Sequence, residues 1–318
     1  MRKVFLLHNP TSGRKSQRMR EVIVAVAGTL RAAGAEVTVE ATRHLGSAAA
    51  QVRELIPHGF DSVFVAGGDG TINDALQGMI PGEAALGVIP MGTGNVLAHD
   101  LGLPMNPLKA VECLLKWKPR RIAVGRMEFT RTQLGASGET DSRWFLSVAG
   151  VGGSAALMYD TLSTHKGGLG MAAYYLHMLK LAAFHDFPSF KVEYLDQHGN
   201  FVQRTAVEAD AVRVGNFGGL MRRWAWGANL ARHDAQLVIF PSSNRLHFVH
   251  YTLARILDTQ WKTPGVEMVH TTQVRCTPID SDTRLHAAAD GEHLGGLPVK
   301  IEIVPNMLNL LMPVDAES

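Results

Sequence analysis

Short apolar runs alternate with longer amphipathic stretches along the first 120 residues of the chain. The apolar runs are short and contain β-branched residues, which predicts buried strands at 3–8, 36–41, 62–66 and 86–89. The stretches between and after them have helical spacing, which predicts helices at 16–33, 46–56, 72–79, 94–101 and 106–117. This alternation is typical of a doubly wound α/β domain, in which helices cover both faces of a parallel sheet.

From about residue 122 the pattern changes to short strands with few helices between them. Strands are predicted within 122–130, 143–149, 190–196, 201–215, 236–240, 270–276, 283–289 and 299–304, with helices near 168–185 and 245–259. Successive strands without intervening helices indicate an antiparallel sandwich or barrel. We therefore expect an α/β domain over 1–122 and a β-rich domain over 123–298.

Composition narrows the class of protein. The 318 residues are 46% hydrophobic and 19% charged, enough for two buried cores. With 31 basic and 29 acidic residues, the net charge of +2 is too balanced for a protein that wraps nucleic acid. The two cysteines, Cys113 and Cys276, lie far apart without metal-ligand spacing, which fits a reducing compartment. No apolar run reaches the ~20 residues that span a bilayer.

Three loops rich in Gly, Thr, Ser or Asn follow predicted strands of the first domain, at 9–13, 67–71 and 90–95. The carboxyl ends of parallel strands meet at one edge of a sheet, where helix N-termini offer backbone N–H groups to phosphate. Asp69 in the second loop would repel phosphate, so its natural role is to hold Mg²⁺ against a nucleotide. Taken alone, each loop also fits ordinary turn and capping chemistry, with Asp69 as a helix cap.

Other nucleotide and hydrolase motifs are missing from the sequence. Neither the second nor the third loop has the Walker A pattern, and the first βα turn lacks the dinucleotide fingerprint GxGxxG. A GxSxG nucleophile elbow is also absent. A plain NAD-binding domain and the commonest hydrolase class are therefore disfavoured.

In order and spacing, the three loops resemble the diacylglycerol kinase catalytic domain that bacterial lipid kinases share with sphingosine and ceramide kinases. The resemblance continues through 150–152, Asn216, Asp234 and 290–292. It implies an NAD kinase-like α/β domain with a C-terminal antiparallel β-sandwich, and a segment 299–318 that returns to the first domain. It also implies ATP and Mg²⁺ as cofactors. The residues expected to bind the nucleotide are Asn9, Thr42, Gly67, Gly68, Asp69, Gly70, Thr71, Ile72, Asn73, Gly92, Thr93 and Asn95.

Phosphoryl transfer to a hydroxyl needs a carboxylate that accepts the hydroxyl proton. The candidate is the run Asp290-Gly291-Glu292. From the residues alone, Asp-Gly between apolar stretches is more typical of a tight hairpin turn. The resemblance implies instead that these acids supply the catalytic base. We expect Glu292 to accept the proton, with Asp290 orienting it or acting in its place.

The resemblance also implies metal ligands and marks departures from the family pattern. Asp69 would organise the Mg²⁺ of the nucleotide. A second, structural Mg²⁺ would be held by the carboxylate of Asp234 and the carbonyls of Ala231 and Gln236. Because His233 and Ala235 depart from the family pattern, a solvated turn is the alternative there. Ser154 and Val96 replace acidic residues of many members, at positions where acceptor choice is set.

A lipid acceptor needs an apolar slot and a way to meet a bilayer. The segment 171–181 is either a wall of that slot or an ordinary packed helix. The cluster at 222–226, with two Arg and two Trp, fits either anionic head groups or one buried face of a strand.

We therefore expect an ATP-dependent lipid kinase that acts on a hydroxyl of a diacylglycerol-like or sphingoid lipid. The alternatives are a kinase of a soluble acceptor such as NAD, and a non-catalytic nucleotide- or lipid-binding regulator. The third loop lacks the Asn-rich NAD kinase pattern, which argues against a kinase of NAD. The acids at 290 and 292 are intact, which argues against a non-catalytic regulator. We expect a cytoplasmic protein that visits the membrane surface transiently, binds no nucleic acid, and could form a homodimer through an exposed strand edge.

Overall fold

The structure is a computed structural model, and it describes residues 2–10, 16–131, 138–156, 187–219, 222–280 and 285–314. The chain divides into two compact units. Unit 1 is Met1–Val124 with Pro305–Ser318, and unit 2 is Gly125–Val304. The sequence placed these divisions at 122/123 and 298/299.

Unit 1 contains a parallel sheet in the order β2-β1-β3-β4-β15. Its strands are β1 (Lys3–His8), β2 (Glu36–Ala41), β3 (Ser62–Gly67), β4 (Ala85–Pro90) and the last part of β15 (Glu292–Met312). Every residue of β3 and β4 is buried, as expected for strands covered on both faces. At the end of β15, Asn309 lies opposite Ala85, which confirms that the last strand returns to this sheet.

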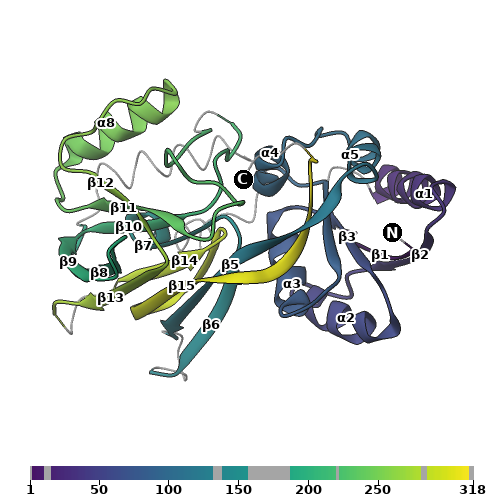
Figure 1. The fold of residues 1–318 in the computed structure, drawn as a ribbon, viewed down its shortest axis with the longest axis horizontal. Coiled ribbons are helices and arrows are strands. Elements are labelled where there is room, and N and C mark those ends of the chain that lie inside the picture. The colour runs from purple at the N-terminus through teal and green to yellow at the C-terminus, as the bar shows by residue number, and fades with distance from the viewer. Residues whose placement is uncertain are drawn as a thin grey trace. The chain divides into compact units, whose positions relative to one another are not determined.

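Five α-helices are described in unit 1: α1 (Ser16–Ala32), α2 (Ala48–Leu55), α3 (Asp69–Met79), α4 (Val96–Asp100) and α5 (Pro107–Leu114). A 3-10 turn, η1 (Ile56–His58), follows α2. Helices α1 and α5 contact each other on one face of the sheet, and α2 and α3 contact each other on the opposite face (Figure 1). The predicted doubly wound α/β architecture is confirmed.

Unit 2 is built around antiparallel strands. The path β12-β11-β10-β7-β14-β15 is antiparallel at every step. Strand β13 joins β15 to β8 and β9, and β6 pairs with β5. The bounds are β5 (Lys118–Thr130), β6 (Thr140–Phe145), β7 (Val148–Gly152), β8 (Phe190–Leu195), β9 (Phe201–Ala206), β10 (Glu208–Val212), β11 (Ala235–Phe240), β12 (Glu267–Thr271), β13 (Gln273–Pro278) and β14 (His286–Ala289).

Helix α8 (Arg245–Ile256) packs on an aromatic core of unit 2. Asn244 caps its N-terminus by accepting a hydrogen bond from the backbone N–H of Leu246 at 3.0 Å. The core between the helix and the strands includes Phe187, Phe240 and, from α8 itself, Tyr251, each 5% exposed or less. The helix predicted at 245–259 is therefore present and ends slightly earlier.

The cluster at 222–226 corrects one expectation and lies in irregular backbone rather than in a strand. The indole N–H of Trp224 donates to Asp210 at 3.0 Å, and that of Trp226 donates to the carbonyl of Thr259 at 3.2 Å. Both indoles are thus held by unit 2 itself. Residues 11–15 and 132–137 and the predicted helix with its segment 171–181 lie outside the described residues.

Candidate active site

The predicted nucleotide-binding residues of unit 1 gather at the carboxyl ends of its parallel strands. The backbone N–H of Thr42, just after β2, donates to the carbonyl of His8 at 2.8 Å. That of Asn9, just after β1, donates to the carbonyl of Ala66 at 3.1 Å. The third loop begins where the N–H of Met91 donates to the carbonyl of Gly67 at 3.0 Å. Adjacent strand ends therefore bring the described parts of all three loops to one sheet edge.

A side-chain contact ties the first loop to the second. The amide Nδ2 of Asn9 donates to the hydroxyl of Thr71 at 3.1 Å. Gly67 is required beside it, because a Cβ there would lie 2.8 Å from the Cβ of Thr71. The strand end and the first turn of α3 are consequently packed too closely for any side chain at position 67.

The second and third loops touch through their glycines. A Cβ on Gly92 would lie 2.5 Å from the Cα of Gly68, a distance that real Cβ atoms do not show. Asn95 then brackets Gly92, since its Oδ1 accepts from the Gly92 N–H at 2.8 Å and its Nδ2 donates to the Gly92 carbonyl at 3.0 Å. Asn95 itself has φ of 50°, the left-handed conformation that asparagine tolerates. The loops form one backbone-lined surface, as close approach to a phosphate requires.

Asp69 links these two loops and carries the charge of the site. Its Oδ1 accepts the backbone N–H of Val96, the first residue of α4, at 2.7 Å. Its Oδ2 would lie 2.7 Å from a Cβ on Gly94, so the third loop also closes over it. Burial raises the pKa of Asp69, against the opposing effect of these backbone hydrogen bonds. Among the described residues, no lysine or arginine forms an ion pair with it.

These surroundings fit a divalent cation at Asp69. A half-buried carboxylate without a lysine or arginine in an ion pair gains from a nearby positive charge, and oxygen is the ligand that Mg²⁺ prefers. The Val96 N–H holds the carboxylate in one orientation. Asp69 is not the N-cap of α3 as predicted, because that position is Gly68 and the carboxylate of Asp69 instead accepts the first N–H of α4. The metal role of Asp69 stays a prediction.

The remaining predicted nucleotide residues divide by burial. Ile72 and Asn73 are both 3% exposed, so Ile72 packs into the core of unit 1. The Oδ1 of Asn73 accepts from Gln77 at 3.3 Å, while its buried Nδ2 has no hydrogen-bond acceptor in the part of the chain that the structure describes. Gly70 and Thr93 are exposed. Of these four, only Gly70 and Thr93 offer surface to a nucleotide directly.

In unit 2, Asp290 and Gly291 form the turn between β14 and β15. Their φ values are 46° and 81°, and Ala289 pairs with Glu292 across the turn. This is the geometry of a two-residue hairpin with both central residues in the left-handed region. The hairpin interpretation of the Asp-Gly pair is therefore correct for the backbone, and the catalytic question concerns only the two carboxylates.

The carboxylate of Asp290 is engaged by backbone N–H groups. Its Oδ2 accepts from Leu146 at 2.7 Å, and its Oδ1 accepts from Ser147 at 2.8 Å and Val148 at 3.0 Å. These bonds fix the turn to the segment that leads into β7. Both oxygens of Asp290 thereby have a structural task.

Glu292 is differently placed. Its Oε2 forms an ion pair with Arg143 on β6 at 2.7 Å, and the two side chains are 36% and 25% exposed. The carboxylate is accessible to solvent and held from one side. Sequence reasoning missed Arg143; the only available signal was a positive residue within the predicted strand at 143–149.

Asp234 has a cation of its own. Its two carboxylate oxygens accept from Arg232 at 2.7 and 2.6 Å, and His270 lies 3.3 Å away. Burial would raise the pKa of Asp234, but Arg232 and His270 outweigh it and lower the pKa. Ala231 lies in the loop before β11, and Gln236 lies on β11 opposite Val212. Within the described ranges, no group of three or more His, Cys, Asp or Glu could hold a metal ion. These surroundings do not favour a second Mg²⁺, which stays a prediction of the resemblance.

Two buried acids on β10 were also missed. Glu208 and Asp210 are 3% and 1% exposed. Both oxygens of Glu208 accept from the Ser154 N–H at 3.1 Å, and the Ser154 hydroxyl donates to Asp210 at 3.0 Å. Burial raises the pKa of Asp210 to about 6 and that of Glu208 well above its ordinary value. Their signal was two alternating acids within the otherwise apolar part of the predicted β segment 201–215.

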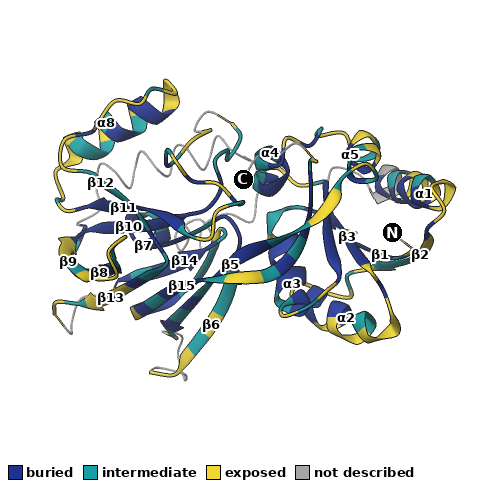
Figure 2. Ribbon diagram, in the orientation of Figure 1, coloured by how far each residue is buried: buried dark blue, intermediate teal, exposed yellow. Residues whose placement is uncertain are grey.

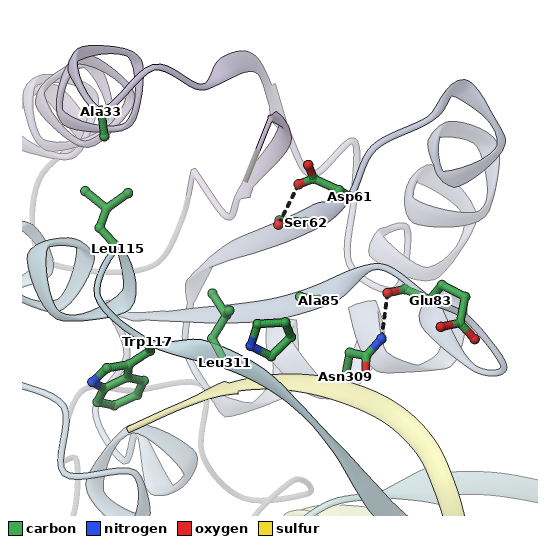
Figure 3. Close-up of a pocket in the computed structure, with 10 residues that line it drawn as sticks. Ala33, Asp61, Ser62, Glu83, Ala85, Leu115, Trp117, Asn309 and Leu311 are labelled. Carbon is green, nitrogen blue, oxygen red and sulfur yellow. Dashed lines mark hydrogen bonds between the residues drawn. The ribbon is translucent and has the colours of Figure 1, made fainter. Parts of the chain in front are cut away.

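A pocket of about 400 Å³ in unit 1 is a different feature (Figure 3). It lies at the amino ends of β3 and β4, beside Asn309 and Leu311 of β15, so it is on the sheet edge opposite the three loops. Of the two carboxylates that line it, Asp61 and Glu83, Asp61 accepts the backbone N–H groups of Arg2 and Lys3. This pocket is therefore separate from the predicted nucleotide residues.

Comparison with known families decides the class of protein. Residues 3–127 match the diacylglycerol kinase catalytic domain, and residues 148–312 match the YegS C-terminal NAD kinase beta sandwich-like domain. The chain belongs to the diacylglycerol kinase family. The resemblance found in the loops, the α/β plus β-sandwich fold and the kinase class are confirmed.

Relatives of this family member span its full length. A diacylglycerol kinase of Bacillus subtilis (strain 168) is 26% identical over 316 residues, covering 98% of this chain and 97% of the relative. The crystal structure of a putative diacylglycerol kinase from Bacillus anthracis superposes with a TM-score of 0.75 at 20% identity, covering 99% and 98% of the two chains. Yeast NADH kinase complexed with NADH gives a TM-score of 0.50 at 10% identity, covering 99% and 84%.

Across the described ranges, none of the helices combines the length and the hydropathy needed to cross a bilayer.

Proposed function

We propose that this diacylglycerol kinase family member transfers the γ-phosphoryl group of ATP to a hydroxyl of a diacylglycerol-like or sphingoid lipid. The observation that carries the proposal is the state of Asp69. It is a half-buried carboxylate that forms no ion pair with a lysine or arginine among the described residues, set between two glycine loops that touch each other. Besides positioning the third loop, that arrangement suits a metal-bound polyphosphate.

In this proposal the loops of unit 1 bind the nucleotide. The backbone around Gly68 would face phosphate oxygens, and Thr93 and Gly70 would supply exposed contacts. Asn9 holds Thr71 and Asn95 holds the third loop, so the phosphate surface is formed before ATP arrives. A bound Mg²⁺ would neutralise phosphate charge, with Asp69 as its protein ligand.

Glu292 of unit 2 accepts the proton of the lipid hydroxyl. Its side chain is exposed enough to meet a substrate, and Arg143 orients it from one side. Asp290 acts by holding the turn, because both of its oxygens are occupied by backbone N–H groups. In this step the hydroxyl oxygen forms a bond to the γ-phosphorus, the bond from that phosphorus to the leaving ADP breaks, and the hydroxyl proton passes to Glu292.

A soluble acceptor such as NAD is the second candidate, favoured by the fold shared with yeast NADH kinase. That likeness shows only the fold. The third loop, 90–95, does not have the Asn-rich pattern expected of NAD kinases.

The deciding experiment follows the label of γ-labelled ATP with Mg²⁺. One reaction contains mixed micelles with a panel of diacylglycerols and sphingoid bases, and a parallel aqueous reaction contains NAD. We expect label in the organic phase, which would also name the acceptor. Label in NAD alone would overturn the lipid assignment, and no label in either phase while ATP binds would favour the non-catalytic regulator.

A further inference from the structure

The side of helix α8 that faces away from unit 2 is apolar. Leu246, Leu253 and Leu257 are 73%, 50% and 57% exposed. Val249 and Ile256 are 47% and 41% exposed on the same side. At 100° per residue these five positions fall within one stripe along the helix, which we call the outer face of α8. A helix on the surface of a globular protein normally has polar residues there.

Packing on the opposite side fixes this orientation. Phe248 stacks on Phe240 with ring centroids 4.5 Å apart and on Phe187 at 4.6 Å. Tyr251 meets Trp224 edge to face at 5.2 Å, and Ala254 is fully buried. Figure 2 shows both buried and exposed surface along α8. The helix therefore cannot turn its outer face inward without breaking an aromatic core.

The apolar surface continues beyond the helix. Trp261 is 54% exposed, and its ring is nearly parallel to that of His250 on α8, with centroids 6.3 Å apart. An exposed tryptophan beside exposed leucines is uncommon on a surface that meets only water. Indole rings are enriched where protein meets the head-group region of a bilayer.

Charge around the outer face is basic. No Asp or Glu occurs between Ala235 and Leu257. Arg245 at the start of α8 and Lys262 after Trp261 are both exposed. The acid that follows, Asp258, is paired with Arg223 at 3.4 Å. An apolar stripe with positive residues at its ends complements an anionic bilayer surface.

We propose that the outer face of α8, together with Trp261, docks onto an anionic lipid bilayer. The inference rests on the proposed function, because a kinase of a bilayer-resident lipid must reach that bilayer. Leucine side chains would enter the acyl boundary, Trp261 would lie at head-group depth, and Arg245 and Lys262 would meet lipid phosphates. A second copy of the chain fits this face less well, since two such surfaces would bring basic ends together.

The test measures binding of the full chain to vesicles without nucleotide. Sedimentation with phosphatidylglycerol-containing vesicles is compared with sedimentation with phosphatidylcholine alone. The variant Leu246→Ser/Leu253→Ser/Leu257→Ser should bind anionic vesicles at least about tenfold more weakly, because each leucine loses its burial in the interface. The matched control is Val24→Ser on α1 in unit 1, where Val24 is 71% exposed. This variant should bind vesicles as the parent does.

Two further measurements keep the test decisive if the triple variant folds poorly. Arg245→Gln/Lys262→Gln should weaken binding to anionic vesicles several-fold and flatten its salt dependence, with little change on neutral vesicles. In the parent, brominated lipid should quench tryptophan fluorescence, and Trp261→Phe should remove most of that quenching.

Activity assays separate this inference from the proposed function. With a water-dispersed short-chain diacylglycerol, the folded triple variant should retain turnover within about twofold, whereas on vesicle-borne substrate it should lose about tenfold. Unchanged vesicle binding by the triple variant would overturn the docking surface even if the enzyme is active. A change in oligomeric state without a change in vesicle binding would overturn it in favour of a second copy. A chain that binds vesicles through α8 but phosphorylates no lipid would overturn the proposed function alone.

Discussion

Asp69 does two things with one carboxylate. It accepts the N–H of Val96 and so positions the third loop, and it presents a charge that forms no ion pair with a lysine or arginine among the residues described. Burial raises its pKa, which means that the surrounding protein holds this charge at a cost. A cation bound beside it would remove that cost. The structural and chemical roles can therefore be separated by changing charge without changing shape.

The substitution Asp69→Asn makes this separation. Asparagine keeps an oxygen for the Val96 N–H and loses the charge, so we expect a melting temperature equal to or above that of the parent. Binding of ATP with Mg²⁺ should weaken at least about tenfold, and turnover should fall by about 10² or more. Calorimetric titration with and without EDTA measures the binding of ATP with Mg²⁺, and label transfer measures turnover. Asp69→Ala is the comparison, since it should lower stability as well. Full turnover by the asparagine variant would remove Asp69 from metal binding.

Glu292 is the second residue whose role can be isolated. Glu292→Gln keeps the size of the side chain and a hydrogen-bond acceptor for Arg143, but it cannot take a proton at neutral pH. We expect kcat to fall by about 10²–10⁴ with ATP affinity nearly unchanged, which is the usual contribution of a general base. Single-turnover label transfer and nucleotide titration give the two numbers. If the variant turns over normally, the base lies elsewhere.

At the scale of elements, the approach of two loops governs the site. Gly67 pairs with Pro90 at the ends of β3 and β4, and the chains then continue side by side as Gly68 and Gly92. Strand pairing sets their separation, and only glycine leaves room for it. The loop glycines are thus a consequence of β3 and β4 being neighbours, as well as of any ligand.

Two alanine substitutions distinguish crowded from open glycines. Gly92→Ala places a Cβ 2.5 Å from the Cα of Gly68, so the loops must separate; we expect unit 1 to lose about 1–3 kcal/mol of stability. Gly70→Ala meets nothing within 4 Å and lies in the first turn of α3, where alanine favours helix. Its stability should stay equal or rise slightly. Thermal unfolding without nucleotide measures both. Equal melting temperatures for the two variants would show that the loops do not touch in solution.

The turn between β14 and β15 shows how two interpretations of one motif coexist. The Asp-Gly pair forms the tight hairpin that its residues predict, with both φ values positive. The same turn places Glu292 in the first position of β15, opposite Ala289. A motif that is explained by local backbone geometry can therefore still present a catalytic side chain, and neither explanation excludes the other.

At the scale of the whole molecule, the buried acids of β10 couple stability to pH. In the unfolded chain Asp210 and Glu208 ionise near 3.8 and 4.5. In the folded chain burial raises both pKa values, that of Asp210 to about 6 and that of Glu208 well above its ordinary value. Above the unfolded values, the unfolded chain binds fewer protons than the folded one. The stabilising contribution of the pair is thus fully present in acid and is lost as the pH rises.

Glu208→Gln should reduce this dependence. Glutamine keeps an oxygen for the Ser154 N–H and can donate to Asp210, with no proton to lose. Between pH 5 and 8 the stability of the parent should fall by about 1–3 kcal/mol more than that of the variant. Thermal unfolding across this range is the measurement, and Glu83→Gln, a side chain that is 88% exposed, is the control. Parallel pH curves for parent and Glu208→Gln would contradict the assignment.

The sequence by itself determined the order and type of the elements, the two kinds of unit and the loops that carry nucleotide chemistry. Periodicity and turn residues are local properties, and β1, β2 and the first loops follow from them. The identity of the Asp290-Gly291 turn followed in the same way. Even the position of α8 was predictable, because its apolar residues recur at helical spacing.

Only the tertiary structure decided which side chains meet and which faces are covered. Arg143 and Glu292 are 149 residues apart in the chain, and no local pattern pairs them. Asp210 is buried because neighbouring strands and Trp224 enclose it. The sequence of α8 has apolar residues on both sides, and packing alone determined that Tyr251 faces the core while Leu253 faces outward. Side-chain contacts depend on the approach of distant segments, a free-energy balance over the whole fold that a short window of sequence does not contain.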